Sequence, residues 1–92
     1  MQVSEQKITR GNAAAVKKEV LTAARSRDAV LDLSNVKTLD SSAVAVVLAW
    51  LRVVQEQGAD PVLIGVPEKM MSLARLYGVH DLLALFVKTA VD

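Results

Sequence analysis

The sequence has no cysteine, and only three of its 92 residues are aromatic. Without cysteine there is neither a disulfide nor a thiolate metal site, so apolar packing must supply the stability of the fold. The few aromatic side chains offer little for stacking on bases, and the net charge of +1 comes without a basic block. We therefore expect no nucleic acid among the partners of this protein.

Long apolar runs are also missing. No run reaches eighteen residues, and residues 1–6 lack the apolar core of a signal peptide. The length of 92 residues allows one small domain, which we place over residues 1–92. We expect this domain to be soluble and cytoplasmic.

The apolar residues that are present alternate between strand-like and helix-like patterns. Short aliphatic runs predict buried strands, and apolar residues at spacings of three and four predict amphipathic helices. The order predicted is a weak edge strand 2–9, helix 13–26 with Asn12 as its N-cap, strand 29–33, polar connection 35–40, helix 43–54, strand 61–66, a helix between Pro67 and Gly78, a short helix 79–86, and a strand or tail 87–91. Such alternation predicts an open α/β sheet with parallel strands.

Helix 43–54 is unusual because eleven of its twelve residues are apolar, Arg52 being the exception. A helix that is apolar on nearly every face is either enclosed by the protein or awaits a partner. Because a domain of this size can hardly enclose it fully, we expect part of its apolar surface to be exposed as an interaction site. Trp50 is then either a core residue or, if exposed, a binding anchor.

Residues that carry catalytic chemistry are scarce. His80 is the only histidine, the four glycines are isolated, and no phosphate-binding loop is present. A triad of Ser41 or Ser42 with His80 and an aspartate lacks a nucleophile-elbow pattern, and a single imidazole specifies no zinc site. The sequence therefore favours a protein that is not an enzyme and that has no cofactor and no metal.

The polar segment Asp40-Ser41-Ser42 precedes the apolar helix. An oxygen-bearing side chain at this point caps the helix by accepting hydrogen bonds from its free N–H groups. A hydroxyl group here is also a place where the helix dipole tolerates phosphate, although Asp40 opposes it. About two added negative charges beside an apolar helix are enough to reject a docked partner. Capping is thus the simpler interpretation, and a phosphate switch is the alternative.

Residues 31–44, Leu-Asp-Leu-Ser-Asn-Val-Lys-Thr-Leu-Asp-Ser-Ser-Ala-Val, resemble the signature of STAS domains, the family of anti-sigma factor antagonists and sulfate-transporter tails. The segments Leu-Ala-Trp-Leu-Arg from Leu48 and Leu-Ala-Arg-Leu-Tyr-Gly-Val from Leu73 are similar to the branch that forms the small STAS subunit of the Mla phospholipid-transport ABC system. The resemblance covers nearly the whole chain from about Thr9 onward.

This resemblance implies a mainly parallel sheet with four helices and no catalysis. It implies a subunit that docks on the cytoplasmic ATPase of the transporter, and so lies peripheral to the inner membrane only through its complex. By position, Asp40 and Ser41 match the partner-facing acid and hydroxyl, and Ser42 matches the serine phosphorylated in anti-sigma factor antagonists, with Ser41 as a second candidate for modification. The residue patterns alone predict Arg75 at the surface and Tyr77 in a half-buried position. The expected partner-binding residues are Asp40, Ser41, Ser42, Val44, Trp50, Arg75 and Tyr77.

The sequence departs from the family pattern in two places. Ala43 stands where the family usually has glycine, a change that favours a longer helix. The chain also begins at what resembles the second strand of the family, so the first strand is short or missing and a sheet edge is expected to be unpaired.

Two functions follow from the sequence. The main hypothesis is a subunit that binds an ABC-transporter ATPase and supports transport of phospholipid for outer-membrane asymmetry. The alternative is an anti-sigma factor antagonist-like switch that a serine kinase phosphorylates on Ser42. An exposed apolar helix and an open sheet edge suit a homodimer and a heterocomplex equally.

Overall fold

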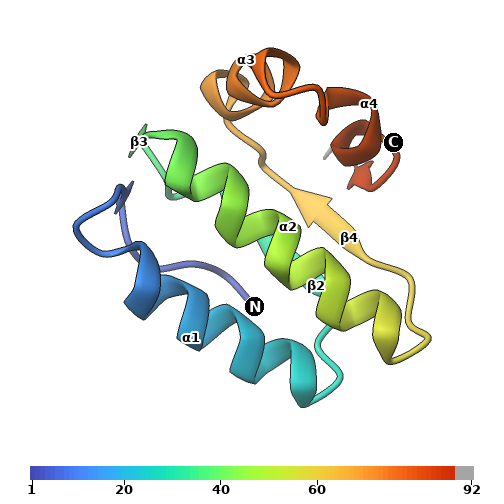
Figure 1. Ribbon diagram of the computed structural model, residues 1–92. Coiled ribbons are helices and arrows are strands. Elements are labelled where there is room, and N and C mark those ends of the chain that lie inside the picture. Colours follow the sequence, from blue (N-terminus) through green and yellow to red (C-terminus); the bar gives the residue numbers. More distant parts are fainter. Residues whose placement is uncertain (89–92) are drawn as a thin grey trace.

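A computed structural model describes residues 1–88 of the chain (Figure 1). Helices and short strands alternate in these residues, as the sequence pattern predicts. In chain order they are β1 (Lys7–Ile8), α1 (Ala13–Arg25), β2 (Val30–Asp32), β3 (Thr38–Leu39), α2 (Ser41–Glu56), β4 (Val62–Ile64), α3 (Glu68–Leu76), α4 (His80–Ala84) and β5 (Val87–Lys88).

The main sheet has the strand order β2-β4-β5, and all of its strands are parallel. Leu31 on β2 lies opposite Leu63 on β4, and Leu63 in turn lies opposite Val87 on β5. A second parallel pair joins β1 to β3, which lies within the segment 35–40 that the sequence predicted as a polar connection. The predicted α/β fold with four helices, an open parallel sheet and a short first strand is confirmed.

The N-terminal strand predicted over residues 2–9 is divided into two pieces. Lys7 and Ile8 form β1, whereas the first three residues run along the outer edge of β2. There the Val3 N–H donates to the Asp32 carbonyl at 3.0 Å, and the Asp32 N–H donates to the Met1 carbonyl at 2.9 Å. The prediction of an unpaired edge is therefore wrong at β2, because the chain covers that edge with its own first residues.

One face of the main sheet is buried and the other is partly open. Leu31 and Leu63 are fully buried, but Val30 is 38% exposed on the opposite face, as expected from the two-residue period of a strand. Asp32, the polar residue in an aliphatic run, lies on this open face. Its Oδ1 accepts hydrogen bonds from the Ser34 backbone N–H at 2.9 Å and from the Ser34 hydroxyl at 2.6 Å, and these bonds lower the pKa of Asp32.

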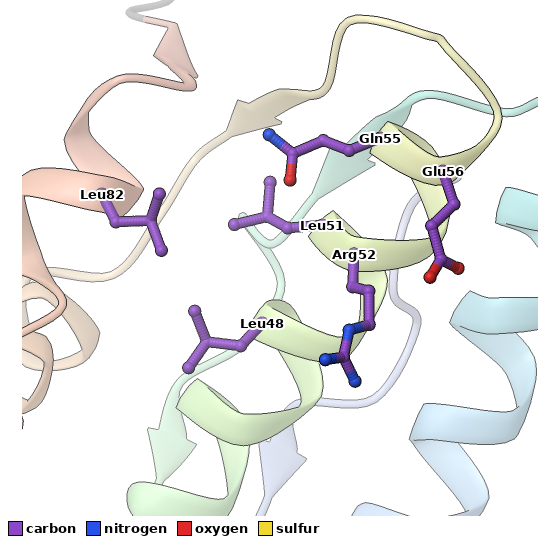
Figure 2. A pocket seen from close by; sticks show the side chains of 6 residues that line it. All are labelled: Leu48, Leu51, Arg52, Gln55, Glu56 and Leu82. Atoms are coloured by element: carbon purple, nitrogen blue, oxygen red, sulfur yellow. The ribbon is translucent and has the colours of Figure 1, made fainter.

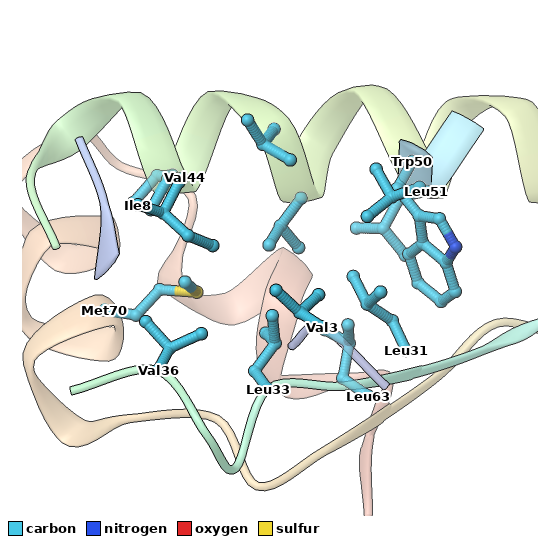
Figure 3. Packing of buried hydrophobic residues seen from close by; sticks show 14 of the residues in the cluster. Val3, Ile8, Leu31, Leu33, Val36, Val44, Trp50, Leu51, Leu63 and Met70 are labelled. Carbon is cyan, nitrogen blue, oxygen red and sulfur yellow. The ribbon is translucent and has the colours of Figure 1, made fainter. Parts of the chain in front are cut away.

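Helices α1 and α2 lie side by side against the buried face of the sheet (Figure 1). Helix α3 contacts α2 and α4 contacts α3, on the side of α2 away from α1. Figure 3 shows the inward side chains of α2 above those of the strands, with Met70 of α3 between them. Trp50 belongs to this core and has no exposed surface, so its prediction as a partner contact is wrong and its alternative interpretation as a core residue is correct.

The observed boundaries of the helices differ slightly from the predicted ones. Helix α2 begins at Ser41 and ends at Glu56, two residues beyond the predicted bounds at each end. Gly78 has a φ of +77° and follows α3 as predicted, because glycine adopts this conformation at little cost. The last predicted helix is shorter, His80–Ala84, and the predicted strand or tail begins as β5, while residues 89–91 lie outside the described residues.

Asn12 is the N-cap residue of α1, but its side chain does not cap the helix. The Asn12 Oδ1 accepts a hydrogen bond from the Thr9 N–H at 2.9 Å, and its Nδ2 donates to the Lys7 carbonyl at 2.7 Å. The side chain therefore fixes the turn that leads from β1 into the helix.

Candidate functional site

The polar segment before α2 acts as a helix cap, as predicted. The Asp40 Oδ1 accepts hydrogen bonds from the Ser42 N–H at 2.9 Å and from the Ser42 hydroxyl, and its Oδ2 accepts from the Arg10 N–H at 3.0 Å. The bond from the Ser42 hydroxyl, followed by those from the two backbone N–H groups, lowers the pKa of Asp40. The carboxylate thus holds the start of α2 and the loop before α1 together.

Ser41 and Ser42 have different environments. Ser42 is half-buried, and its hydroxyl donates to Asp40, so it is part of the cap. Ser41 is exposed and lines a hollow together with Val44 and Tyr77. Of the two hydroxyl groups, that of Ser41 is therefore the one available to an approaching partner.

The hollow at Ser41 continues along α2 as an apolar groove, which we call the α2 groove. One side is formed by the outer residues of α2, and the other by the segment that joins α3 to α4 and by α4 itself. Figure 2 shows Leu48 and Leu51 facing Leu82 of α4 across the groove, with Arg52 on the neighbouring turn. The groove is lined by Ser41, Val44, Ala45, Leu48, Ala49, Leu51, Arg52, Gln55, Glu56, Tyr77, Val79 and Leu82.

Exposed apolar side chains gather on α3, α4 and their flanks. Among residues 1–88, five large apolar side chains are exposed, and four of them belong to α3, α4 and their immediate flanks: Leu76 (75%), Tyr77 (56%), Leu82 (43%) and Leu85 (76%). None of the five lies on α2, because α2 buries most of its apolar residues. The large exposed apolar side chains expected on helix 43–54 are therefore found on α3, α4 and their flanks instead.

The structure brings together some of the predicted site residues and separates others. Ser41, Val44 and Tyr77 share the α2 groove, although Val44 forms its floor and is only 3% exposed. Asp40 does not line the groove but fixes the start of α2 beside it, through the hydrogen bonds that it accepts from Ser42. Arg75 is exposed in a separate shallow hollow next to the groove.

Nine of the twelve groove residues were not predicted as site residues, and among them are Ala45, Leu48 and Leu82. The first two recur with Ser41 and Arg52 at spacings of three and four, which places them on one face of a helix. That signal was present but hidden, because almost every other residue of the segment is also apolar. Leu82 could not be placed before the position of α4 relative to α2 was known.

His80 lies at the start of α4, and its Nδ1 is 3.1 Å from the Asp81 Oδ1. In the part of the chain that the structure describes, no three histidine or acidic side chains are grouped as metal ligands would be. None of the helices in residues 1–88 is both long and apolar enough to cross a membrane.

The α/β fold with its capped, groove-bearing α2 agrees with a comparison of the sequence with family models. The model described as "Mlab, STAS domain" matches residues 5–85. The chain belongs to this STAS-domain family. The match includes every helix of the STAS domain and its first four strands, so the Asp40 cap and the whole α2 groove lie inside it. Domains of this family are generally not enzymes. Among curated proteins, no significant match was found.

Proposed function

We propose that this STAS domain is a non-catalytic subunit that binds and supports the cytoplasmic ATPase of an ABC-type phospholipid transporter, through which outer-membrane lipid asymmetry is maintained. The α2 groove is the docking surface, and association with the inner membrane is indirect, through the ATPase and its permease. The observation that carries the proposal is the apolar groove with a polar mouth in a domain of the MlaB type.

The groove has the composition of a protein interface. Its centre is apolar, at Leu48 and Leu82, and its ends carry polar groups such as Ser41 and Glu56. Tyr77 is a partly exposed aromatic residue, the type that often contributes most to binding energy. Covering apolar surface contributes about 25 cal/mol per Å² to docking, which offsets the freedom that two proteins lose when they associate.

The proposal is tested by measuring binding of the purified ATPase subunit from the same host by titration calorimetry. Leu48→Asp places a charge in the centre of the groove, and we expect the affinity to fall by about 100-fold. Ala15→Asp on the exposed side of α1 is the matched control and should bind like the wild type. Equal affinities for the two variants, with both folded by circular dichroism, would contradict the proposal.

The alternative, a switch phosphorylated on Ser42, is less well supported by the geometry. The Ser42 hydroxyl is half-buried and bonded to Asp40, so a phosphate there would lie beside a carboxylate and would replace the cap. Intact-mass spectrometry of the protein from its native host separates the two functions. Stoichiometric phosphate on Ser42, together with recovery of a serine kinase, would favour the switch.

A further inference from the structure

We infer that the partner element seated in the α2 groove is an amphipathic helix with an acidic side chain that faces Arg52. This inference rests on the proposed function and adds the chemistry of the surface that the groove recognises.

The α2 side of the groove has the spacing of a helix-binding surface. Ser41, Ala45, Leu48 and Arg52 follow one another at intervals of three and four residues along α2. A ridge of this kind fits the grooves of a second helix, and the small side chain of Ala45 lets the two axes approach to about 8–10 Å. From Ser41 to Gln55 the groove extends for about 21 Å at 1.5 Å per residue, which is the length of about four helical turns.

Arg52 is the one basic residue that lines the groove, and it contributes to the hollows on both sides of Leu48. It is exposed, and no carboxylate in residues 1–88 lies within 4.0 Å of its guanidinium group, including that of Glu56 one turn further on. In Figure 2 the guanidinium group lies over the Leu48 side of the groove and not toward Glu56.

A helix that covers Leu48 also removes water from the guanidinium group of Arg52. A buried cation without a partner is costly, and a carboxylate satisfies a guanidinium group with two parallel hydrogen bonds. Arg75 lines a separate hollow together with Asp81, so Arg52 is the basic side chain that the groove itself presents. Glu56, one turn further along α2, repels acidic groups, so the acidic residue belongs on the side of Arg52 that faces Leu48.

The test is titration calorimetry of the purified ATPase subunit with Arg52→Glu and, as matched control, Arg25→Glu. Arg25 is exposed in the last turn of α1 and lines no part of the groove. We expect Arg52→Glu to bind about tenfold more weakly, most strongly at low salt, and Arg25→Glu to remain within about twofold of the wild type. Equal affinities of these two variants would overturn the inference while the loss in Leu48→Asp still supports the proposed function. If the wild type does not bind the ATPase, the proposed function itself fails.

Hydrogen–deuterium exchange of the ATPase in the complex tests the nature of the partner element. We expect protection in a helix that contains Asp or Glu, and reversal of that acidic residue to Lys should restore binding of Arg52→Glu. Protection confined to a loop, to a strand or to a helix without an acidic residue would overturn the inference. So would a wild-type homodimer that Arg52→Glu dissociates in sedimentation analysis, because the groove would then hold a second copy of this chain.

Discussion

Replacement of Gly65 by alanine tests the close approach between the ends of β2 and β4. Gly65 follows β4 with a φ of +65°, and a Cβ atom on it would lie 2.7 Å from the Ser34 Cβ and 2.9 Å from the Ser34 Cα and N. Ser34 has little room to move, since both its backbone N–H and its hydroxyl donate to Asp32. The new methyl group therefore collides with held backbone atoms.

The expected cost has two parts. Alanine in the left-handed conformation costs about 1–2 kcal/mol, and forcing an extra carbon into a packed site costs about 1–3 kcal/mol more. Gly58 has a φ of +76° but nothing within 4 Å of its added Cβ, so Gly58→Ala should carry only the first part. For a domain of this size, each kcal/mol lowers the melting temperature by about 4–8 °C.

The assay is thermal unfolding followed by circular dichroism, with urea unfolding as a second measure of the free energy. We expect Gly65→Ala to melt at least about 5 °C below Gly58→Ala. If the two variants melt at the same temperature, the approach of Ser34 to Gly65 has no energetic consequence and the reasoning is refuted.

Three further predictions concern α2. Ser41→Asp should weaken binding to the ATPase without changing the melting temperature. Ser42→Asp should instead lower the melting temperature, because the cap loses its hydroxyl donor and gains a carboxylate beside Asp40. Calorimetry measures the effect on binding, and thermal unfolding measures the effect on stability. Because the pKa of Asp40 lies below its ordinary value of 3.8, the carboxylate stabilises the fold fully above that value and loses its effect as the pH falls through the lowered pKa. The difference in melting temperature between wild type and Asp40→Asn should thus shrink below about pH 4, and a difference that stays constant would contradict this. Trp50, fully buried, should be quenched by acrylamide only on unfolding and should report no change when the ATPase binds; strong quenching of the folded protein would show that the indole is accessible.

The local features of the site were predictable because they depend on neighbours in the sequence. The cap at Asp40 and the end of α3 at Gly78 both involve residues within a few positions of one another. Helix α2 was predicted two residues short at each end, since its apolar pattern begins after the cap and stops before its last polar turn.

Features that join distant segments were not predictable in this way. The first residues pair with β2 because the unpaired N–H and C=O groups at the edge of a strand can hydrogen-bond to any segment within reach. No pattern in residues 1–3 predicts this pairing. For the same reason the sequence left two interpretations of Trp50, a core residue or an exposed binding anchor. An apolar helix gives no signal of which face is inside until its neighbours are placed.

Composition and periodicity by themselves determined a small α/β domain with parallel strands, a capped apolar helix and no evident catalytic set, because these properties follow from residue type and local spacing. Only the tertiary structure decided that Ser41 faces outward while Ser42 is held by Asp40, and that Leu48 and Leu82 meet across a groove beside Arg52. The physical reason is that a groove forms where two elements, here α2 and α4, are held apart, and their separation depends on all the side chains buried beneath them.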